Sequence, residues 1–315
     1  MRSMIDAEIH AENSNAVPEN GDRGGRVSFI GIHPVKSLAA LEPEAWWFGP
    51  QGPDLDRRWM VVDGDGRFLS LREVPELIRL RPSFLEPWRP KAEPGIIEGN
   101  RLPRVRLQDD HGSIEFQPTS RPDTSRARLW KAERVIVDEG DDLAHWLSGR
   151  LGRPARLVRH RPDLDPWTQP EPEAMGATTG LADGYPVLVV AEQTIVDAVG
   201  PEYSPRRFRA NIIVKGAPPA AEDCWLRIAI GDLELELVKP CVRCVATMVH
   251  PDLGINQGPE PLATLRRTRL WNRKPVLGWN ALVHRSGTVS IGDDVRILER
   301  RKTSPVAHLS HRVRE

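Results

Sequence analysis

Short runs of β-branched and aromatic residues recur along the chain from Arg26 onward, and glycine, proline or aspartate separates them. The runs in the first half are RVSFIGI, RWMVVD, GRFLSL, RVRLQ, SIEF and RVIVD. Such runs between turn-forming residues are typical of strands and predict antiparallel hairpins. The clearest hairpin surrounds the Asp-Gly-Asp-Gly turn at 63–66, because glycine adopts the backbone angles of a tight reversal without steric cost.

One segment of the first half has the spacing of a helix. Leu143, Leu147 and Leu151 lie on one helical face together with Trp146, and Gly152 follows directly. This pattern predicts a helix over Asp141–Leu151 that ends at the glycine.

The second half follows a stretch rich in proline and acidic residues at 161–179, which predicts a surface loop between the two halves. PVLVVAEQTIVDAVG then predicts a buried strand followed by a short helix. Further strands are predicted by ANIIVKG, WLRIAIGDLELELV, CVATMV, ALVHRSGTVSIGD and VRILE. Many short strands with turns at such spacing indicate a barrel.

Composition narrows the class of protein. No apolar run approaches the roughly 20 residues that span a bilayer, so we expect no membrane association. Lys plus Arg equals Asp plus Glu, at 44 each, and the chain therefore lacks the basic excess of a typical nucleic-acid binder. Three cysteines do not suit a disulfide framework, and the first residues lack the apolar core of a secretory signal. We therefore expect a cytoplasmic protein without a nucleic-acid partner.

Cys241 and Cys244 form a CxxC pair within KPCVRCVATMV. Zinc normally needs four ligands, and only Cys224 and His250 are near in sequence. A redox dithiol normally precedes a helix, whereas β-branched residues follow this pair. Two buried structural cysteines are the third alternative.

Cationic and polar residues gather at the predicted strand ends in both halves, in HPVKS (33–37), DRRW (56–59) and RFRAN (207–211). Arginine and lysine side chains beside a thiolate would form a pocket for an anion such as a phosphate. The chain has neither a P-loop nor a GxGxxG motif that would bind phosphate in another way.

With these motifs the sequence resembles the MOSC-domain molybdenum proteins, in the branch with an N-terminal β-barrel domain that includes the amidoxime-reducing components. The resemblance runs in family order from about residue 27 to 298. Its segments are IHPVKS, LDRRWMVVD, SLREVP, GYPVLVVAEQTI, FRANIIV, IGDLELELVKPCVRCVATMVHPDLG, EPLATLR and GTVSIGDDV.

The resemblance implies a mainly β fold with a few helices (α+β), in which an N-terminal β-barrel-like domain packs on a MOSC β-barrel. We expect a disordered tail at 1–25, the N-terminal domain at 26–160 and the Pro-rich loop at 161–179. The MOSC domain is expected at 180–300 and a basic tail at 301–315.

The resemblance also implies a molybdenum cofactor, with Cys244 as the catalytic residue and the protein ligand to the metal. A soft thiolate suits such a thiolate-rich centre. The residues implied to bind the pterin and its phosphate are Lys36, Ser37, Arg57, Arg72, Arg209 and Asn211. The role of Arg243, between the two cysteines, stays open, because regular strand geometry points its side chain away from both.

The function implied is reduction of N-hydroxylated compounds by a molybdenum-cofactor oxidoreductase. Three cysteines are too few for a four-thiolate iron–sulfur site, and no dinucleotide motif is present, so electrons are expected from outside. The expected partners are a ferredoxin- or cytochrome b5-type donor with its reductase, and a small N-hydroxylated substrate. The alternative function is a cofactor carrier or a sulfur-transfer module, in which Cys244 would hold a persulfide without redox turnover.

Overall fold

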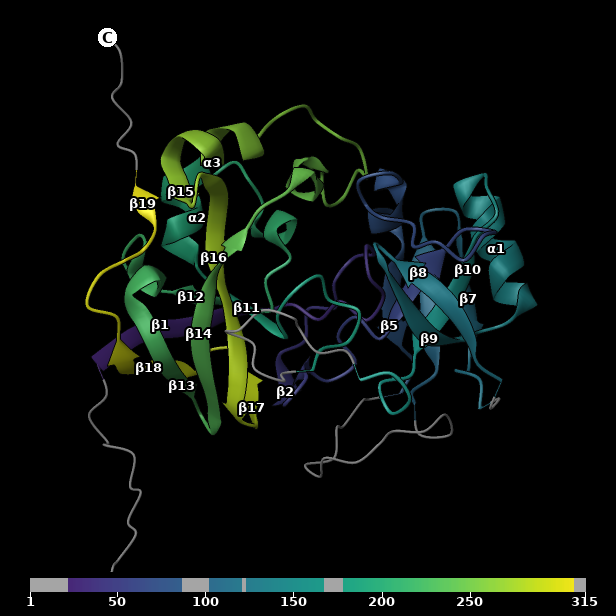
Figure 1. The fold of residues 1–315 in the computed structure, drawn as a ribbon, viewed down its shortest axis with the longest axis horizontal. Coiled ribbons are helices and arrows are strands. Elements are labelled where there is room, and N and C mark those ends of the chain that lie inside the picture. Colours follow the sequence, from purple (N-terminus) through teal and green to yellow (C-terminus); the bar gives the residue numbers. More distant parts are fainter. Residues whose placement is uncertain (1–21, 87–101, 121–122, 167–177, 309–315) are drawn as a thin grey trace, which may run out of the picture.

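A computed structural model of the chain describes residues 22–86, 102–120, 123–166 and 178–308. Two lobes lie side by side, with the later strands and two helices in one lobe and strands β4–β10 with helix α1 in the other (Figure 1). The expected fold class, mainly β with a few helices, is confirmed. No helix within the described residues is long and apolar enough to cross a membrane.

The first lobe is a closed barrel. Its seven strands pair in the order β11-β12-β1-β18-β13-β14-β16, and a further pairing of β11 with β16 closes the ring. The strands are β1 (Asp22–Ile30), β11 (Val187–Ala191), β12 (Ile212–Lys215), β13 (Trp225–Ile230), β14 (Leu233–Val242), β16 (Lys274–Arg285) and β18 (Asp294–Arg300).

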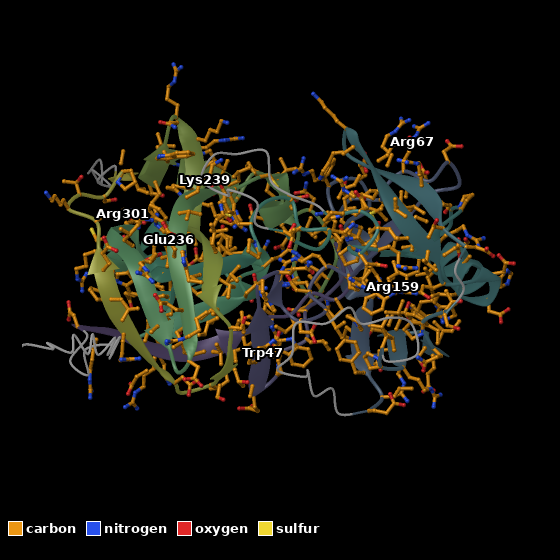
Figure 2. The ribbon with its side chains drawn as sticks, turned by 60° about the horizontal axis from the view of Figure 1, so that its bottom comes forward. Trp47, Arg67, Arg159, Glu236, Lys239 and Arg301 are labelled. Atoms are coloured by element: carbon orange, nitrogen blue, oxygen red, sulfur yellow. The ribbon has the colours of Figure 1, made fainter. Side chains whose placement is uncertain are left out.

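Alternation explains why these segments close around a core. In β14, Leu233, Leu235 and Leu237 are completely buried, whereas the glutamates between them are partly exposed. Successive side chains of a strand point to opposite faces, so every second residue fills the barrel. Figure 2 shows Glu236 and Lys239 of this strand on the barrel lobe, away from Arg67 and Arg159 of the other lobe.

The strand β1 differs from the expected boundary at residue 26. It begins at Asp22 and pairs with β18 on one side and β12 on the other, so it belongs to the barrel although it precedes the N-terminal lobe in sequence. The polar composition of 22–25 did not indicate this strand, because backbone hydrogen bonds to β18 need no apolar side chain. Residues 1–21 of the expected tail lie outside the described residues.

Short elements complete the barrel lobe. The parallel strands β11 and β12 are joined through α2 (Glu192–Val199) and the 3-10 helix η4 (Pro205–Phe208). The C-terminal strand β19 pairs with β15, so part of the expected basic tail at 301–315 is ordered, while 309–315 lie outside the described residues. The remaining elements are η5 (Ala221–Cys224), η6 (Val245–Met248), α3 (Leu262–Thr268), β15 (Arg269–Trp271) and β19 (Ala307–His308).

The N-terminal lobe consists of two curled sheets, with orders β4-β10-β9-β8 and β5-β6-β7. Its elements are β4 (Trp59–Val62), η1 (Pro75–Arg79), β5 (Arg81–Phe84), β6 (Val105–Asp109), β7 (Gly112–Phe116), β8 (Ser125–Leu129), β9 (Ala132–Asp138), α1 (Asp141–Leu151) and β10 (Arg156–His160). A small sheet of β2 (Ala45–Gly49), β3 (Gly52–Pro53) and β17 (Gly287–Ser290) joins the two halves of the sequence.

Two local predictions in this lobe are confirmed. The helix α1 spans Asp141–Leu151 and ends at Gly152, whose φ of 63° lies in the left-handed region that favours glycine. The chain reverses at 63–66, where the N–H of Asp63 donates to the carbonyl of Arg67 at 2.8 Å and Val62 pairs with Phe68. Of the expected Pro-rich loop at 161–179, residues 167–177 lie outside the described residues.

Candidate functional site

A pocket of about 200 Å³ is lined by residues of both lobes. The N-terminal half supplies the segments around residues 36, 57 and 70 together with Trp130, and the barrel supplies the segments around 184, 209 and 243. All the site residues named from the sequence line this pocket: Lys36, Ser37, Arg57, Arg72, Arg209, Asn211 and Cys244. The structure therefore brings residues of all three cationic segments and the CxxC segment into one place.

Local pairing positions the N-terminal part of the pocket. Val35 forms a bridge with Trp59, and the N–H of Lys36 donates to the carbonyl of Trp59 at 2.8 Å. In turn, the N–H of Arg57 donates to the carbonyl of His33 at 2.7 Å. The segments 33–37 and 56–59 are thus fixed against each other, which aims Lys36 and Arg57 at the same pocket.

Three of the site residues have positive φ angles, namely 75° at Ser37, 48° at Arg57 and 52° at Arg209. Residues other than glycine rarely adopt this conformation, which costs about 1 kcal/mol or more each. Such strain persists only where surrounding contacts hold it, and it gathers at functional sites. The backbone therefore supports a functional reading of these three positions independently of their side chains.

The two arginines bring positive charge close together. Arg57 Nη2 donates to the carbonyl of Arg209 at 3.3 Å, and Arg209 Nη1 donates to the carbonyl of Leu38 at 2.8 Å. Loss of hydration, followed by repulsion from Arg57, lowers the pKa of Arg209 to about 9. The two guanidinium groups are held close together and out of water. This arrangement favours the binding of an anion, whose charge offsets their mutual repulsion.

Asp56 and His33 form the buried support of Arg57. The Asp56 carboxylate bonds Arg57 and accepts the N–H of His33 at 2.7 Å. Burial acts to raise the pKa of Asp56, but Arg57 and His33 hold it below its ordinary value. Burial, followed by Arg57 and Arg209, lowers the pKa of His33 well below 6.5, so this imidazole is neutral at pH 7. The positive charge at this point therefore belongs to the arginines.

Lys36 is 7% exposed and donates from Nζ to the carbonyl of Leu181 at 2.8 Å and to Oδ1 of Asp183 at 2.6 Å. Burial lowers the pKa of Lys36, whereas the Asp183 carboxylate acts to raise it. Arg72 is more exposed, and its guanidinium carbon lies 4.6 Å from the ring centroid of Trp130. Both cations face the pocket from the N-terminal half of the chain.

Asn211 and Ser37 use their side chains within the protein. Asn211 Oδ1 accepts the N–H of Leu188 at 3.0 Å, and Nδ2 donates to the carbonyl of Gly31 at 3.0 Å, so this amide ties the neighbouring strands together. Ser37 Oγ accepts the N–H of Leu71 at 3.1 Å and still carries its own hydroxyl proton as a donor. The geometry thus gives Asn211 a structural task that the sequence did not indicate.

The CxxC segment leaves regular strand geometry at the pocket. The pairing of β14 with β16 shifts register between Pro240 and Val242, and β14 ends at Val242. Cys241 and Cys244 consequently line the same pocket, and Arg243 Nη1 lies 3.1 Å from the Cys241 sulfur. The expectation that Arg243 points away from both cysteines is wrong, because residues 241 and 243 are two positions apart and share one face of a strand.

The three cysteines are free thiols, and Cys224 is not among the described residues that line the pocket. Within the described part of the chain, no group of three or more His, Cys, Asp or Glu side chains is arranged to hold a metal ion. A pair of thiols beside arginines thus offers single soft ligands and not a closed zinc site.

Sequence reasoning named Arg207 only as part of the cationic segment at 207–211, and it did not name Asp183 or Trp130 as site residues. Arg207 is 6% exposed, and its Nη1 donates to the carbonyls of Thr247, Met248 and Val249 at 3.4, 3.3 and 3.1 Å, which anchors the segment that follows Cys244. Its adjacency to FRAN was the only signal. No signal connected Trp130, in the β8–β9 turn, with the barrel.

Comparison with known proteins agrees with this architecture. Residues 24–154 match the MOSC N-terminal beta barrel domain, and residues 178–296 match the MOSC domain. The chain is 31% identical over 300 residues to mitochondrial amidoxime reducing component 2 of Rattus norvegicus, covering 86% of this chain and 82% of that protein. It is 28% identical over 293 residues to mitochondrial amidoxime-reducing component 1 of Mus musculus, covering 87% and 82%.

A second kind of relative is the molybdenum cofactor sulfurase of Danio rerio, at 27% identity over 258 residues. That match covers 76% of this chain but 30% of the sulfurase. The two domain matches, which together span most of the chain, define a MOSC-domain protein with an N-terminal MOSC barrel domain. Within that class, the chain belongs to the family of the amidoxime-reducing components.

Proposed function

We propose that the chain is a molybdenum-cofactor oxidoreductase that reduces N-hydroxylated compounds with electrons from an external redox partner. The observation that carries the proposal is the pocket itself, which Cys244 lines together with Lys36, Arg57 and Arg209. The names of the amidoxime-reducing relatives support the substrate class.

The residues present fit such a cofactor. Guanidinium and ammonium groups bind a phosphate through charge-assisted hydrogen bonds, and arginine adds a bidentate geometry. A cysteine thiolate is the soft ligand that suits a metal already held by sulfur. Lys36, Ser37, Arg57, Arg72 and Arg209 would hold the pterin and its phosphate, and Cys244 would bind the metal. Asn211 would act by holding the strands that carry Arg209.

When bound, the cofactor supplies two-electron chemistry for removal of the oxygen of an N–OH group. The chain contributes binding, orientation and a restricted environment. The Arg207 contacts fix the segment after Cys244, which holds the thiol at one place relative to the arginines. Because Lys36 is nearly buried, its interaction with an anion is screened by water less than that of a surface lysine.

Cofactor transfer or sulfur transfer is the second candidate function, and the match to a molybdenum cofactor sulfurase favours it. In that role Cys244 would carry a persulfide or pass on the cofactor without redox turnover. The pocket suits this role as well, because it brings the Cys244 thiol and several cationic side chains together.

Metal analysis and an activity assay together separate the two functions. The full chain, produced in a host that makes the molybdenum cofactor, is analysed for molybdenum and then assayed with a chemical reductant and benzamidoxime. Bound molybdenum with turnover supports the oxidoreductase. Bound molybdenum without turnover across several N-hydroxylated substrates favours the carrier, and absence of molybdenum contradicts both.

A further inference from the structure

Asp183 is an unexpected member of a pocket for anions. Among the described residues that line the pocket it is the only acidic side chain, whereas six are cationic: Lys36, Arg57, Arg72, Arg207, Arg209 and Arg243. A carboxylate at this place repels an anionic ligand. Its presence therefore calls for a function that outweighs the repulsion.

The contacts of Asp183 tie the segment before β11 to the N-terminal lobe. Its Oδ1 accepts from Lys36 Nζ at 2.6 Å and from Trp130 Nε1 at 2.7 Å. Trp130 belongs to the β8–β9 turn of the N-terminal lobe, where its ring lies edge-on to Phe68, with 5.3 Å between centroids, and beneath the Arg72 guanidinium. One carboxylate oxygen thus connects a buried ammonium with an indole from a distant part of the same lobe.

Lys36 needs such a partner to keep its charge. Its ammonium is nearly buried, and Arg57 and Arg209 add repulsion, so all three influences favour the neutral amine. Asp183 is the opposing influence, and Phe68 adds a ring whose centroid is 5.3 Å from Nζ. An opposite charge at this distance changes a pKa by about 1–3 units. A neutral amine would lose the charge-assisted bond to an anion.

We propose that Asp183 is a positioning residue that keeps Lys36 protonated and directed into the pocket, and that Trp130 holds the Asp183 carboxylate in place. Because the side chain of Asp183 is 56% exposed, its position depends on these two donors and not on packing. The inference rests on the proposed function only in that the anion of interest is the phosphate of the cofactor.

The proposal predicts that Asp183→Asn has opposite effects at low and high pH. At low pH Lys36 is protonated in both proteins, and removal of the carboxylate removes repulsion, so the variant binds an anion more tightly. As pH rises through the lowered pKa of Lys36, the variant loses this charge before the wild type does. The two affinity curves should therefore cross.

Sulfate is a suitable probe, because it keeps its double charge from about pH 5.5 to 10.5, a range that reaches the ordinary pKa of lysine. The full chain is produced in a host without the molybdenum cofactor, and sulfate affinity is measured by calorimetry across this range. Lysine NMR follows the Lys36 side chain, which Lys36→Arg assigns. We expect the pKa of Lys36 to fall by about 1–3 units in Asp183→Asn, and its sulfate affinity to fall about fivefold or more with rising pH.

Asp110→Asn is the matched control, since Asp110 also bonds two cations, Arg79 and Arg81, but is not a pocket residue. It should behave as the wild type does. Trp130→Phe keeps an aromatic ring and removes the N–H donor to Asp183. It should therefore lower the pKa of Lys36, as Asp183→Asn does, but by a smaller amount.

An unchanged pKa of Lys36 in Asp183→Asn, with affinity curves parallel to those of the wild type, would overturn the proposal. A Trp130→Phe protein identical to the wild type would remove Trp130 from it. Neither measurement needs molybdenum, so a chain that never carries the metal would contradict the proposed function without deciding this test.

Discussion

Glu222 gives the barrel a pH-dependent stability that can be measured directly. This residue of η5 is fully buried, and its Oε2 accepts from Thr194 Oγ1 at 2.7 Å. Its Oε1 has no hydrogen-bond partner among the described residues. Burial raises the pKa of Glu222 to about 7, the neighbouring Asp223 adds to the effect, and Arg269 opposes it.

The direction and the size of this pH effect on stability follow from proton linkage. The ordinary pKa of this carboxyl is 4.5, so between pH 4.5 and about 7 the folded chain binds a proton that the unfolded chain has released. Stability therefore falls as pH rises through this window, is unaffected below it and is lowest above it. A gap of about 2.5 units corresponds to about 3 kcal/mol of unfolding free energy.

Glu222→Gln keeps the shape and an acceptor for Thr194 but removes the charge. We expect its free energy of unfolding to match that of the wild type within about 1 kcal/mol near pH 4.5 and to exceed it by about 2–3 kcal/mol at pH 8. Urea unfolding at the two pH values measures both. Glu299→Gln on the exposed face of β18 should change neither value. Equal pH slopes in Glu222→Gln and the wild type would refute the reasoning.

The proposed function leads to three further predictions. Cys244→Ser should abolish reduction of benzamidoxime with an unchanged circular dichroism spectrum, whereas Cys241→Ser should keep measurable activity, because a hydroxyl is a poor match for a soft metal centre. Equal loss in both would point to a dithiol or zinc site. Arg209→Ala or Lys36→Ala should each lower molybdenum content at limiting cofactor about tenfold or more, since a charge-assisted bond contributes about 1.5–3 kcal/mol; full content in both would exclude them from the site. The purified protein should be inert with NADH alone and active with a reduced dye, ferredoxin or cytochrome b5, at rates that fall with salt. Turnover with NADH in protein free of reductase would contradict an external donor.

Many individual strands and helices could be predicted from local sequence pattern, but which strands form the barrel could not. The alternation in β14 and the helical spacing before Gly152 each determine a local conformation, and the structure has both elements. The partners of β1 are β12 and β18, far along the chain, and its sequence contains nothing that selects them. Strand pairing between distant segments depends on the global arrangement, so residues 26–30 looked like the start of the following domain and residues 22–25 looked like part of the tail.

The candidate site was visible in the sequence as residue types at strand ends and as a family pattern. That information placed the seven residues in one pocket but did not assign the task of each side chain. Asn211 looks like a ligand residue in FRAN, yet both ends of its amide bond backbone groups. Trp130 looks like an ordinary turn residue, yet it bonds Asp183, which lies 53 residues further along the chain. Roles of this kind depend on contacts between distant segments, which no local pattern contains.

The charges and strain of the pocket have a common explanation. Ser37, Arg57 and Arg209 hold left-handed backbone conformations, and burial together with the nearby Arg57 lowers the pKa of Arg209. Neither feature stabilises the fold. The left-handed conformations strain the backbone, and the two neighbouring arginines repel each other. An anion that binds the arginines would remove the repulsion, and its binding energy would stabilise the folded chain. The large cores of both lobes supply the stability that allows the pocket to remain strained and cationic until then.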